Sequence, residues 1–106
     1  MKRLIRESAG VLNLGATGRE ILTLLHQHRR RGLSVKEIIE KTKRSERAIK
    51  WHLQRLFRLK LVKREIFITP NRRRAHRYRF PSKEEFLRSV EAEIHRRLAR
   101  LKRIAG

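Results

Sequence analysis

Along most of this chain apolar residues recur three or four positions apart, which is the spacing of one face of an α-helix. Three segments in the first 60 residues have this spacing; their apolar positions are Ile21, Leu24 and Leu25, then Val35, Ile38 and Ile39, then Ile49, Leu53 and Leu56. From Val62 to Phe80 the period changes to two, which is the spacing of a β-strand. The pattern therefore predicts three helices followed by a β-hairpin.

Ser and Thr residues predict where the helices begin. A Ser or Thr with Glu three residues later can form a capping box, in which each side chain bonds a free backbone amide of the first turn. This pattern occurs three times, at Thr17 and Glu20, Ser34 and Glu37, and Ser82 and Glu85. Ser45 is expected to cap the third helix without a reciprocal Glu, and Gly32 to end the first.

The strands of the hairpin are predicted on either side of Thr69-Pro70-Asn71, which breaks the alternation. Arg72, Arg73 and Arg74 are then placed at the tip of the hairpin. Tyr78, in the second strand, is expected to pack against Phe67 or the body of the domain.

A final helix after Pro81 has a continuous apolar stripe. Its members are Leu87, Val90, Ile94, Leu98, Leu101 and Ala105. A lone amphipathic helix on so small a domain is expected to bury such a stripe against a second copy, as a coiled coil or helix pair. The alternative is that the helix packs back on its own domain. Residues 1–16 are expected to add a short helix and a pad for the core.

Composition adds a strong charge to this picture. The 106 residues contain 30 Lys and Arg against 10 acidic residues, all Glu, for a net charge of +20. Residues 41–79 contain 15 positive and 2 negative side chains, so the positive charge is concentrated on the third helix and the hairpin. A charge of this size indicates a polyanionic partner. Because 39% of the residues are hydrophobic, we expect a folded domain and not a basic tail.

Several classes of protein are disfavoured. The chain has no Cys, which excludes disulfide scaffolds, thiol enzymes and thiolate zinc sites. No apolar run is long enough for a membrane span or a secretory signal, so a cytoplasmic, nucleoid-associated protein is expected. The five His lack partners at metal-ligand spacing, and no phosphate-binding Gly loop or catalytic constellation is recognisable. We therefore expect no enzyme activity, cofactor or metal. The Arg, Lys and Glu-rich composition is also typical of heat-adapted proteins.

Three helices, the third of them basic, followed by a hairpin with a basic tip, are the winged helix-turn-helix arrangement. In this arrangement the third helix enters the major groove of DNA and the hairpin tip reaches the neighbouring backbone or minor groove. The expected contacts on the third helix are Ser45, Arg47, Ala48, Lys50, Trp51, Gln54 and Arg55. Those on the hairpin are Asn71, Arg72, Arg73, Arg74 and Arg77.

Residues 34–62 resemble the helix-turn-helix core of archaeal and bacterial winged-helix transcription regulators, most of all the TrmB type. Leu14-Gly15-Ala16-Thr17 before the first helix and Arg77-Tyr78-Arg79-Phe80-Pro81 before the last are similar to segments of that type. MarR-like and ArsR-like relatives share these motifs. The resemblance implies a mainly α fold with a small β-hairpin that binds double-stranded DNA as a dimer.

On this interpretation residues 1–81 form the DNA-binding domain and residues 82–106 the dimerisation helix, whose contacts are Leu87, Val90, Ile94, Leu98 and Leu101. Two departures stand out. Lys60 replaces the Gly that is usual in the turn before the wing, so this turn is expected to be built differently. The resemblance does not extend to the effector domain of long TrmB-type regulators, so we expect no small-molecule effector.

The roles of two residues and the choice among four functions stay open. Gln54 could pair with adenine or only contact water, and Trp51 could pack under the wing, contact DNA or meet a partner protein. The leading function is a transcription regulator, and the first alternative is a chromatin protein that coats DNA without regard to sequence. An RNA-binding protein and an adaptor with an acidic protein partner are further alternatives.

Overall fold

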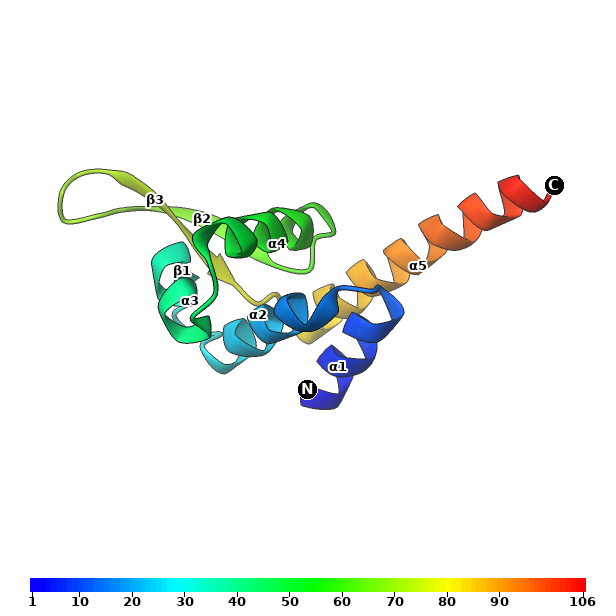
Figure 1. Cartoon of the computed structure of the whole chain (residues 1–106), viewed down its shortest axis with the longest axis horizontal. Coiled ribbons are helices and arrows are strands. Elements are labelled where there is room, and N and C mark those ends of the chain that lie inside the picture. The colour runs from blue at the N-terminus through cyan, green and yellow to red at the C-terminus, as the bar shows by residue number, and fades with distance from the viewer.

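The computed structural model describes residues 1–106 and contains five helices and a three-stranded sheet (Figure 1). The elements in chain order are α1 (Lys2–Val11), α2 (Gly15–Gln27), β1 (Leu33–Ser34), α3 (Val35–Thr42), α4 (Glu46–Arg58), β2 (Lys63–Ile68), β3 (Arg74–Arg79) and α5 (Lys83–Ala105). The three predicted helices, the hairpin and the final helix are all present. The mainly α fold with a small hairpin is thereby confirmed.

The sheet has one more strand than predicted. Its strands are antiparallel in the order β1-β3-β2, and β1 is only two residues long, with Leu33 opposite Tyr78. Gly32, just before β1, has φ of +76°, and a Cβ at this position would lie 2.8 Å from the carbonyl oxygen of Tyr78. Only Gly therefore lets β1 approach β3 this closely.

A single hydrophobic core joins all five helices and the sheet. It consists of Ile5, Ala9, Leu12, Leu14, Ile21, Leu22, Leu25, Leu33, Ile38, Ile49, Leu53, Leu56, Leu61, Val62, Tyr78, Phe80, Phe86 and Val90. Tyr78 lies in this core, as expected of a residue that packs on the body. The expected pad from residues 1–16 is also present, since Ile5, Ala9, Leu12 and Leu14 are core residues.

The last helix packs on this core only at its beginning. Phe86, Val90 and Glu93 are buried, and Arg97 bonds the Leu12 carbonyl. The rest of the helix extends away from the body and ends in solvent (Figure 1). The molecule is consequently elongated, with extents of 55 × 26 × 26 Å. We call residues 94–106 the arm.

Three of the four predicted helix starts are correct. Ser34 and Ser82 form capping boxes with Glu37 and Glu85, and Ser45 accepts a hydrogen bond from the Ala48 amide. The prediction at Thr17 is wrong, because α2 begins at Gly15 without a side-chain cap. The cause is the short link from α1, in which Asn13 adopts a left-handed backbone and the Leu14 amide bonds the Ala9 carbonyl.

The predicted end of the first helix at Gly32 is also wrong. Helix α2 ends at Gln27, and a loop with Arg29, Arg30 and Arg31 follows. Arg79 of β3 holds this loop, since its guanidinium donates hydrogen bonds to all three of these Arg carbonyls and to the Glu65 carboxylate. The loop is thus fixed by contacts from residues about 50 positions away in the sequence.

Candidate nucleic-acid interface

Helix α4 presents a polar and cationic face to solvent because its apolar face is sunk in the core. Ile49, Leu53 and Leu56 are at most 1% exposed. The exposed positions are Glu46, Arg47, Lys50, Trp51, Gln54 and Arg58. Because its apolar side is buried, α4 is held in place by the core, and its polar side is accessible to a ligand.

The start of α4 is well defined. The Ser45 hydroxyl accepts a hydrogen bond from the Ala48 amide at 3.1 Å, and the half-buried Ala48 adds no polar group to the exposed face. Lys43, in the turn before it, has a left-handed backbone with φ of +57° and an exposed side chain. Sequence reasoning overlooked Lys43 because no period or motif marks a turn residue.

Two of the cations predicted on α4 already have partners within the chain. Lys50 forms an exposed ion pair with Glu46, one turn earlier, at 3.0 Å. Arg55 is half-buried and donates a hydrogen bond to the Asn13 carbonyl at 3.2 Å. Arg55 therefore ties α4 to the loop between α1 and α2, whereas Arg47 is free of such contacts.

Trp51 is exposed, with 55% of its surface open to solvent. Of the three alternatives left open for Trp51, packing under the wing does not agree with this exposure. The guanidinium of Arg55 lies 5.8 Å from the centre of its ring, and the ring of His52 meets it edge to face at 4.8 Å. The pKa of His52 is lowered by burial and by the charges of Arg55 and Arg44, so this His is neutral at pH 7 and leaves the aromatic pair uncharged.

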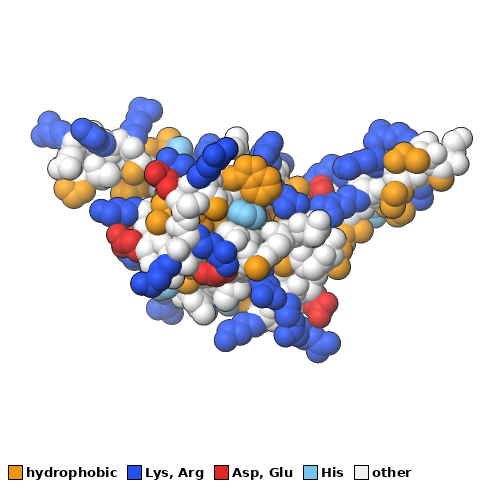
Figure 2. Space-filling model, in the orientation of Figure 1, with side chains coloured by type: hydrophobic (Ala, Val, Ile, Leu, Met, Phe, Trp, Pro, Cys, Tyr) orange, Lys and Arg blue, Asp and Glu red, His pale blue; other side chains and the backbone are white.

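The hairpin tip, which consists of the turn at residues 69–73 and the first residue of β3, Arg74, is basic and extends away from the body (Figure 1). Arg72 adopts a left-handed backbone with φ of +59°, and the Thr69 hydroxyl accepts a hydrogen bond from the Arg73 amide. The side chains of Asn71, Arg72, Arg73 and Arg74 are exposed. In the space-filling view several Lys and Arg side chains project from this end of the molecule, beside uncharged and hydrophobic surface (Figure 2).

Arg77 does not lie at the tip with the other predicted residues. It is half-buried near the root of the hairpin, where its guanidinium stacks on Phe67 at 4.3 Å and its Nε is buried without a hydrogen-bond partner. Alternation in a strand fixes the face of a side chain but not its distance from the body. This placement was therefore invisible in the sequence.

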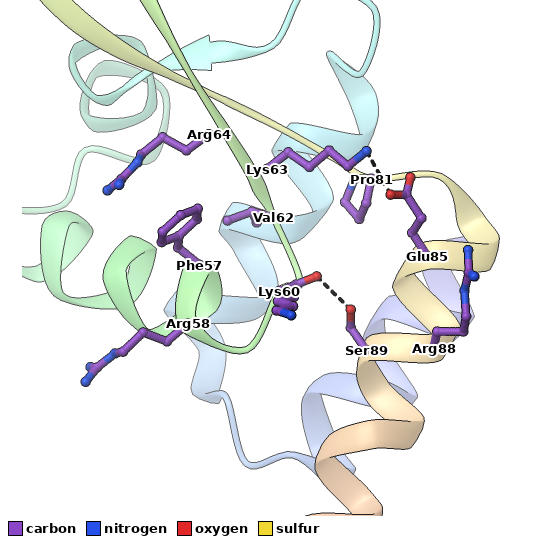
Figure 3. A pocket seen from close by; sticks show the side chains of 10 residues that line it. All are labelled: Phe57, Arg58, Lys60, Val62, Lys63, Arg64, Pro81, Glu85, Arg88 and Ser89. Carbon is purple, nitrogen blue, oxygen red and sulfur yellow. Dashed lines mark hydrogen bonds and ion pairs between the residues drawn. The ribbon is translucent and has the colours of Figure 1, made fainter.

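A basic groove of about 790 Å³ separates the end of α4 and the start of β2 from the start of α5 (Figure 3). Its lining residues are Phe57, Arg58, Lys60, Val62, Lys63, Arg64, Pro81, Glu85, Arg88 and Ser89. Lys63 pairs with Glu85 at 2.8 Å, and this bond, with those from Ser82, lowers the pKa of Glu85 to about 2. The guanidinium of Arg64 covers the ring of Phe57 at 4.1 Å.

The turn beside this groove is not built differently from one with Gly. Lys60 itself adopts the left-handed backbone that Gly favours, with φ of +60°. The Ser89 hydroxyl of α5 donates a hydrogen bond to the Lys60 carbonyl at 2.8 Å (Figure 3). The strained turn is thereby attached to the last helix.

The stripe on α5 is divided between core and solvent. Val90, expected in the dimer contact, is 9% exposed and packs in the core of its own domain. Leu87, Ile94, Leu98 and Leu101 are 42%, 41%, 45% and 62% exposed. We call these four residues the exposed stripe.

Other kinds of site find little support in the geometry. No group of three His or Glu side chains is placed to hold a metal ion. None of the helices combines the length and apolar character needed to cross a membrane.

Solved structures that resemble this one are transcription regulators by description. A possible transcriptional regulator from Methanosarcina mazei Go1 matches with a TM-score of 0.73 and 12% identity, over 92% of this chain and 81% of that chain. MepR, a transcription regulator of the Staphylococcus aureus multidrug efflux pump MepA, matches with a TM-score of 0.60 and 19% identity, over 94% and 74%. The S. aureus MepR–DNA complex gives 0.58 and 20%, over 95% and 70%.

The chain has the winged-helix fold. In winged-helix terms α3 and α4 are the helix-turn-helix, α4 stands in the place of the recognition helix, and β2 and β3 form the wing. The sequence itself matches no protein-family model and no curated protein.

Proposed function

We propose that this winged-helix protein is a dimeric transcription regulator that binds double-stranded DNA. The proposal rests on two features that occur together. Helix α4 is fixed on the core with its cationic face exposed, and the exposed tip of the wing contains three consecutive Arg. In a winged helix these two elements approach DNA together. The net charge of +20 supplies the long-range attraction.

Helix α4 is proposed to read the major groove, which is about 12 Å wide and admits one helix. Arg47 and Gln54 are the side chains on its free face that can meet base edges, because neither has a partner within the chain. Lys43 and Lys50 are suited to phosphate contacts at the start of the helix, where backbone amides also favour anions.

The wing tip is proposed to contact the backbone or the minor groove beside the α4 site. Arg inserts readily into a narrow minor groove, where the potential is most negative. Asn71, Arg72, Arg73 and Arg74 can make this contact, whereas Arg77 is proposed to support the wing through its stacking on Phe67. A complex of MepR with DNA supports this assignment by likeness of fold.

Dimerisation is proposed to occur through the exposed stripe of α5. Four large apolar side chains on one line of an isolated helix are unusual for a monomer. Ile94→Glu should therefore give a monomer in sedimentation while the fold is retained, and Ala99→Glu, on another side of the arm, should leave the dimer intact. A dimer in Ile94→Glu would place the contact elsewhere.

A chromatin-type coat is the second candidate, favoured by the distribution of charge. Glu93 is the last acidic residue, and five Lys and Arg follow it. Cations spread over the arm and the groove, as well as over α4 and the wing, would bind backbone without regard to sequence.

The test is selection from a random duplex library at near-physiological salt, followed by titration of the winners against bulk DNA. A two-fold symmetric motif bound at least about a thousandfold more tightly than bulk DNA supports the regulator. Tight binding without a motif supports the coat, and preference for structured RNA over duplex contradicts both.

A pair of matched variants locates the reading surface. Replacement of Arg47 and Gln54 by Ala should abolish the preference for the selected motif. Replacement of Arg3 and Gln27 by Ala removes the same charge and the same groups from exposed positions outside α4 and should preserve it. Equal loss in both variants would remove α4 from the proposal.

A further inference from the structure

The two halves of α5 carry opposite charge. Residues 83–93 contain four Glu and two basic residues, whereas residues 94–106 contain five basic residues and no acid. Two helices that pair in parallel bring like halves together, and two that pair antiparallel bring opposite halves together. In paired helices, charged residues beside the line of apolar contacts between them, here called the seam, determine whether the helices are parallel or antiparallel.

The exposed stripe is nearly symmetric along the helix. Leu87 and Leu101 stand seven residues before and seven residues after Ile94. Seven residues are close to two turns, so all three side chains lie on one line. A two-fold axis perpendicular to the helix at Ile94 would therefore place Leu87 of each copy against Leu101 of the other.

The same axis would form an ion pair at each end of the seam. Lys102 stands 18 residues after Glu84, which is five full turns, so both lie on one line beside the stripe. Neither has an ion-pair partner within its own chain, and both are exposed. With the axis at or just before Ile94, Glu84 of one copy would lie close to Lys102 of the other.

We propose that α5 pairs with α5 of a second copy in antiparallel orientation, centred near Ile94. The inference rests on the proposed dimer and adds its direction. Phe86, Val90 and Glu93 turn one side of α5 toward its own domain, which leaves the stripe side open as far back as Leu87. The arm of the second copy can thus reach the first turns of α5, and the two winged-helix bodies stand at opposite ends of the seam.

Disulfide trapping tests the orientation cleanly, because the chain has no Cys of its own. Ile94→Cys should cross-link to itself on mild oxidation in either orientation. Leu101→Cys should not cross-link to itself, since the two copies of this position would lie roughly 20 Å apart along the helix. A mixture of Leu87→Cys and Leu101→Cys should give the mixed dimer. Ala99→Cys, off the stripe, is the control that should form no disulfide-linked dimer.

Each outcome decides a different question. No cross-link in Ile94→Cys overturns the dimer through α5 and the orientation with it. A cross-link of Leu101→Cys to itself keeps the dimer and overturns the antiparallel orientation. A cross-link in the mixture but not in Leu101→Cys alone supports the inference.

Exchange of the two charges tests the proposed ion pairs between Glu84 and Lys102 without an engineered Cys. Lys102→Glu should weaken the dimer by roughly two- to tenfold, because it sets two Glu against each other at both ends of the seam. Addition of Glu84→Lys to the same chain should restore the dissociation constant. Failure of the second change to restore it would contradict the pairing of these residues.

Discussion

Glu93 of α5 accepts a hydrogen bond from Arg97, one turn later, at 2.9 Å. The same guanidinium donates to the Leu12 carbonyl at 2.8 Å, and Arg96 bonds the other oxygen of Glu93. Glu93 is only 8% exposed, and Arg97 joins α5 to the end of α1. The pair therefore fixes the direction in which the arm leaves the body.

Glu93→Gln should lower stability at pH 7 by about 1–3 kcal/mol, since it removes a charge from two hydrogen bonds. Burial alone raises the pKa of Glu93, but the hydrogen bonds from Arg97 and Arg96 outweigh it, so the pKa lies below its ordinary value of 4.5. A lowered pKa stabilises the fold above the unfolded value and ceases to do so as the pH falls through the folded value. Urea unfolding between pH 6 and pH 3 should thus show a steeper loss of stability in the parent than in Glu93→Gln.

Glu91→Gln is the control for this prediction, because Glu91 is an exposed carboxylate on the same helix. It should follow the parent curve over the whole range. Parallel curves for the parent and Glu93→Gln would mean that Glu93 does not carry the acid sensitivity.

Replacement of Arg72, Arg73 and Arg74 by Ala should weaken duplex binding and reduce its salt dependence. Each lost phosphate contact lowers the slope of log affinity against log salt by about 0.9. The measurement is a titration of labelled duplex at several salt concentrations. Replacement of Lys2, Arg3 and Arg6 by Ala removes an equal charge from α1, and an equal slope change there would mean that only net charge matters.

Local features of this fold were predictable, and contacts between distant segments were not. The capping boxes at Ser34 and Ser82 and the period of two in the hairpin involve neighbours in the sequence, so pattern alone identified them. Strand β1 was not predicted, because two residues are too few to show the alternation of a strand. The start of α2 was predicted at the wrong residue, because the Leu14 amide bonds the Ala9 carbonyl of the preceding helix and not a capping side chain.

The candidate site divides in the same way. That Ile49 would be buried and Arg47 free followed from helical period. Two other contacts depend on where α1 and the body lie. Arg55 bonds the Asn13 carbonyl, and Val90 packs in the core and is not part of the exposed stripe. No spacing along the chain encodes either contact.

Trp51 is the only tryptophan and should report DNA binding directly. Its exposed ring on α4 should be quenched readily by acrylamide in the free protein and be shielded when duplex is bound. Trp51→Ala should change stability by no more than about 0.5 kcal/mol, because the ring is exposed, yet weaken binding roughly tenfold. Unchanged quenching at saturating duplex would place Trp51 outside the interface.

Lys60→Gly should raise stability by up to about 1 kcal/mol, because a residue with a Cβ is strained at a φ of +60° and Gly is not. Lys60→Ala removes the same charge but keeps the Cβ, and should give no such gain. Chemical denaturation of the three proteins measures the difference. Equal stability of the Gly and Ala variants would show that the turn stores no strain.

Three of the arginines that hold the body together donate to backbone carbonyls: Arg55 to Asn13, Arg97 to Leu12, and Arg79 to the loop that contains Arg29, Arg30 and Arg31. With three times as many bases as acids, the chain has too few carboxylates to pair with every cation that its packing encloses. A carbonyl oxygen accepts the hydrogen bond but cancels no charge and cannot be protonated near neutral pH. The bonds to carbonyl oxygens consequently persist in acid and leave the charge of each Arg uncancelled, whereas the pairing of Arg79 with Glu65 and of Arg97 with Glu93 is lost when these carboxylates are protonated. Arg55, which has a carbonyl partner alone, thus keeps both its contact and its full charge toward an external polyanion.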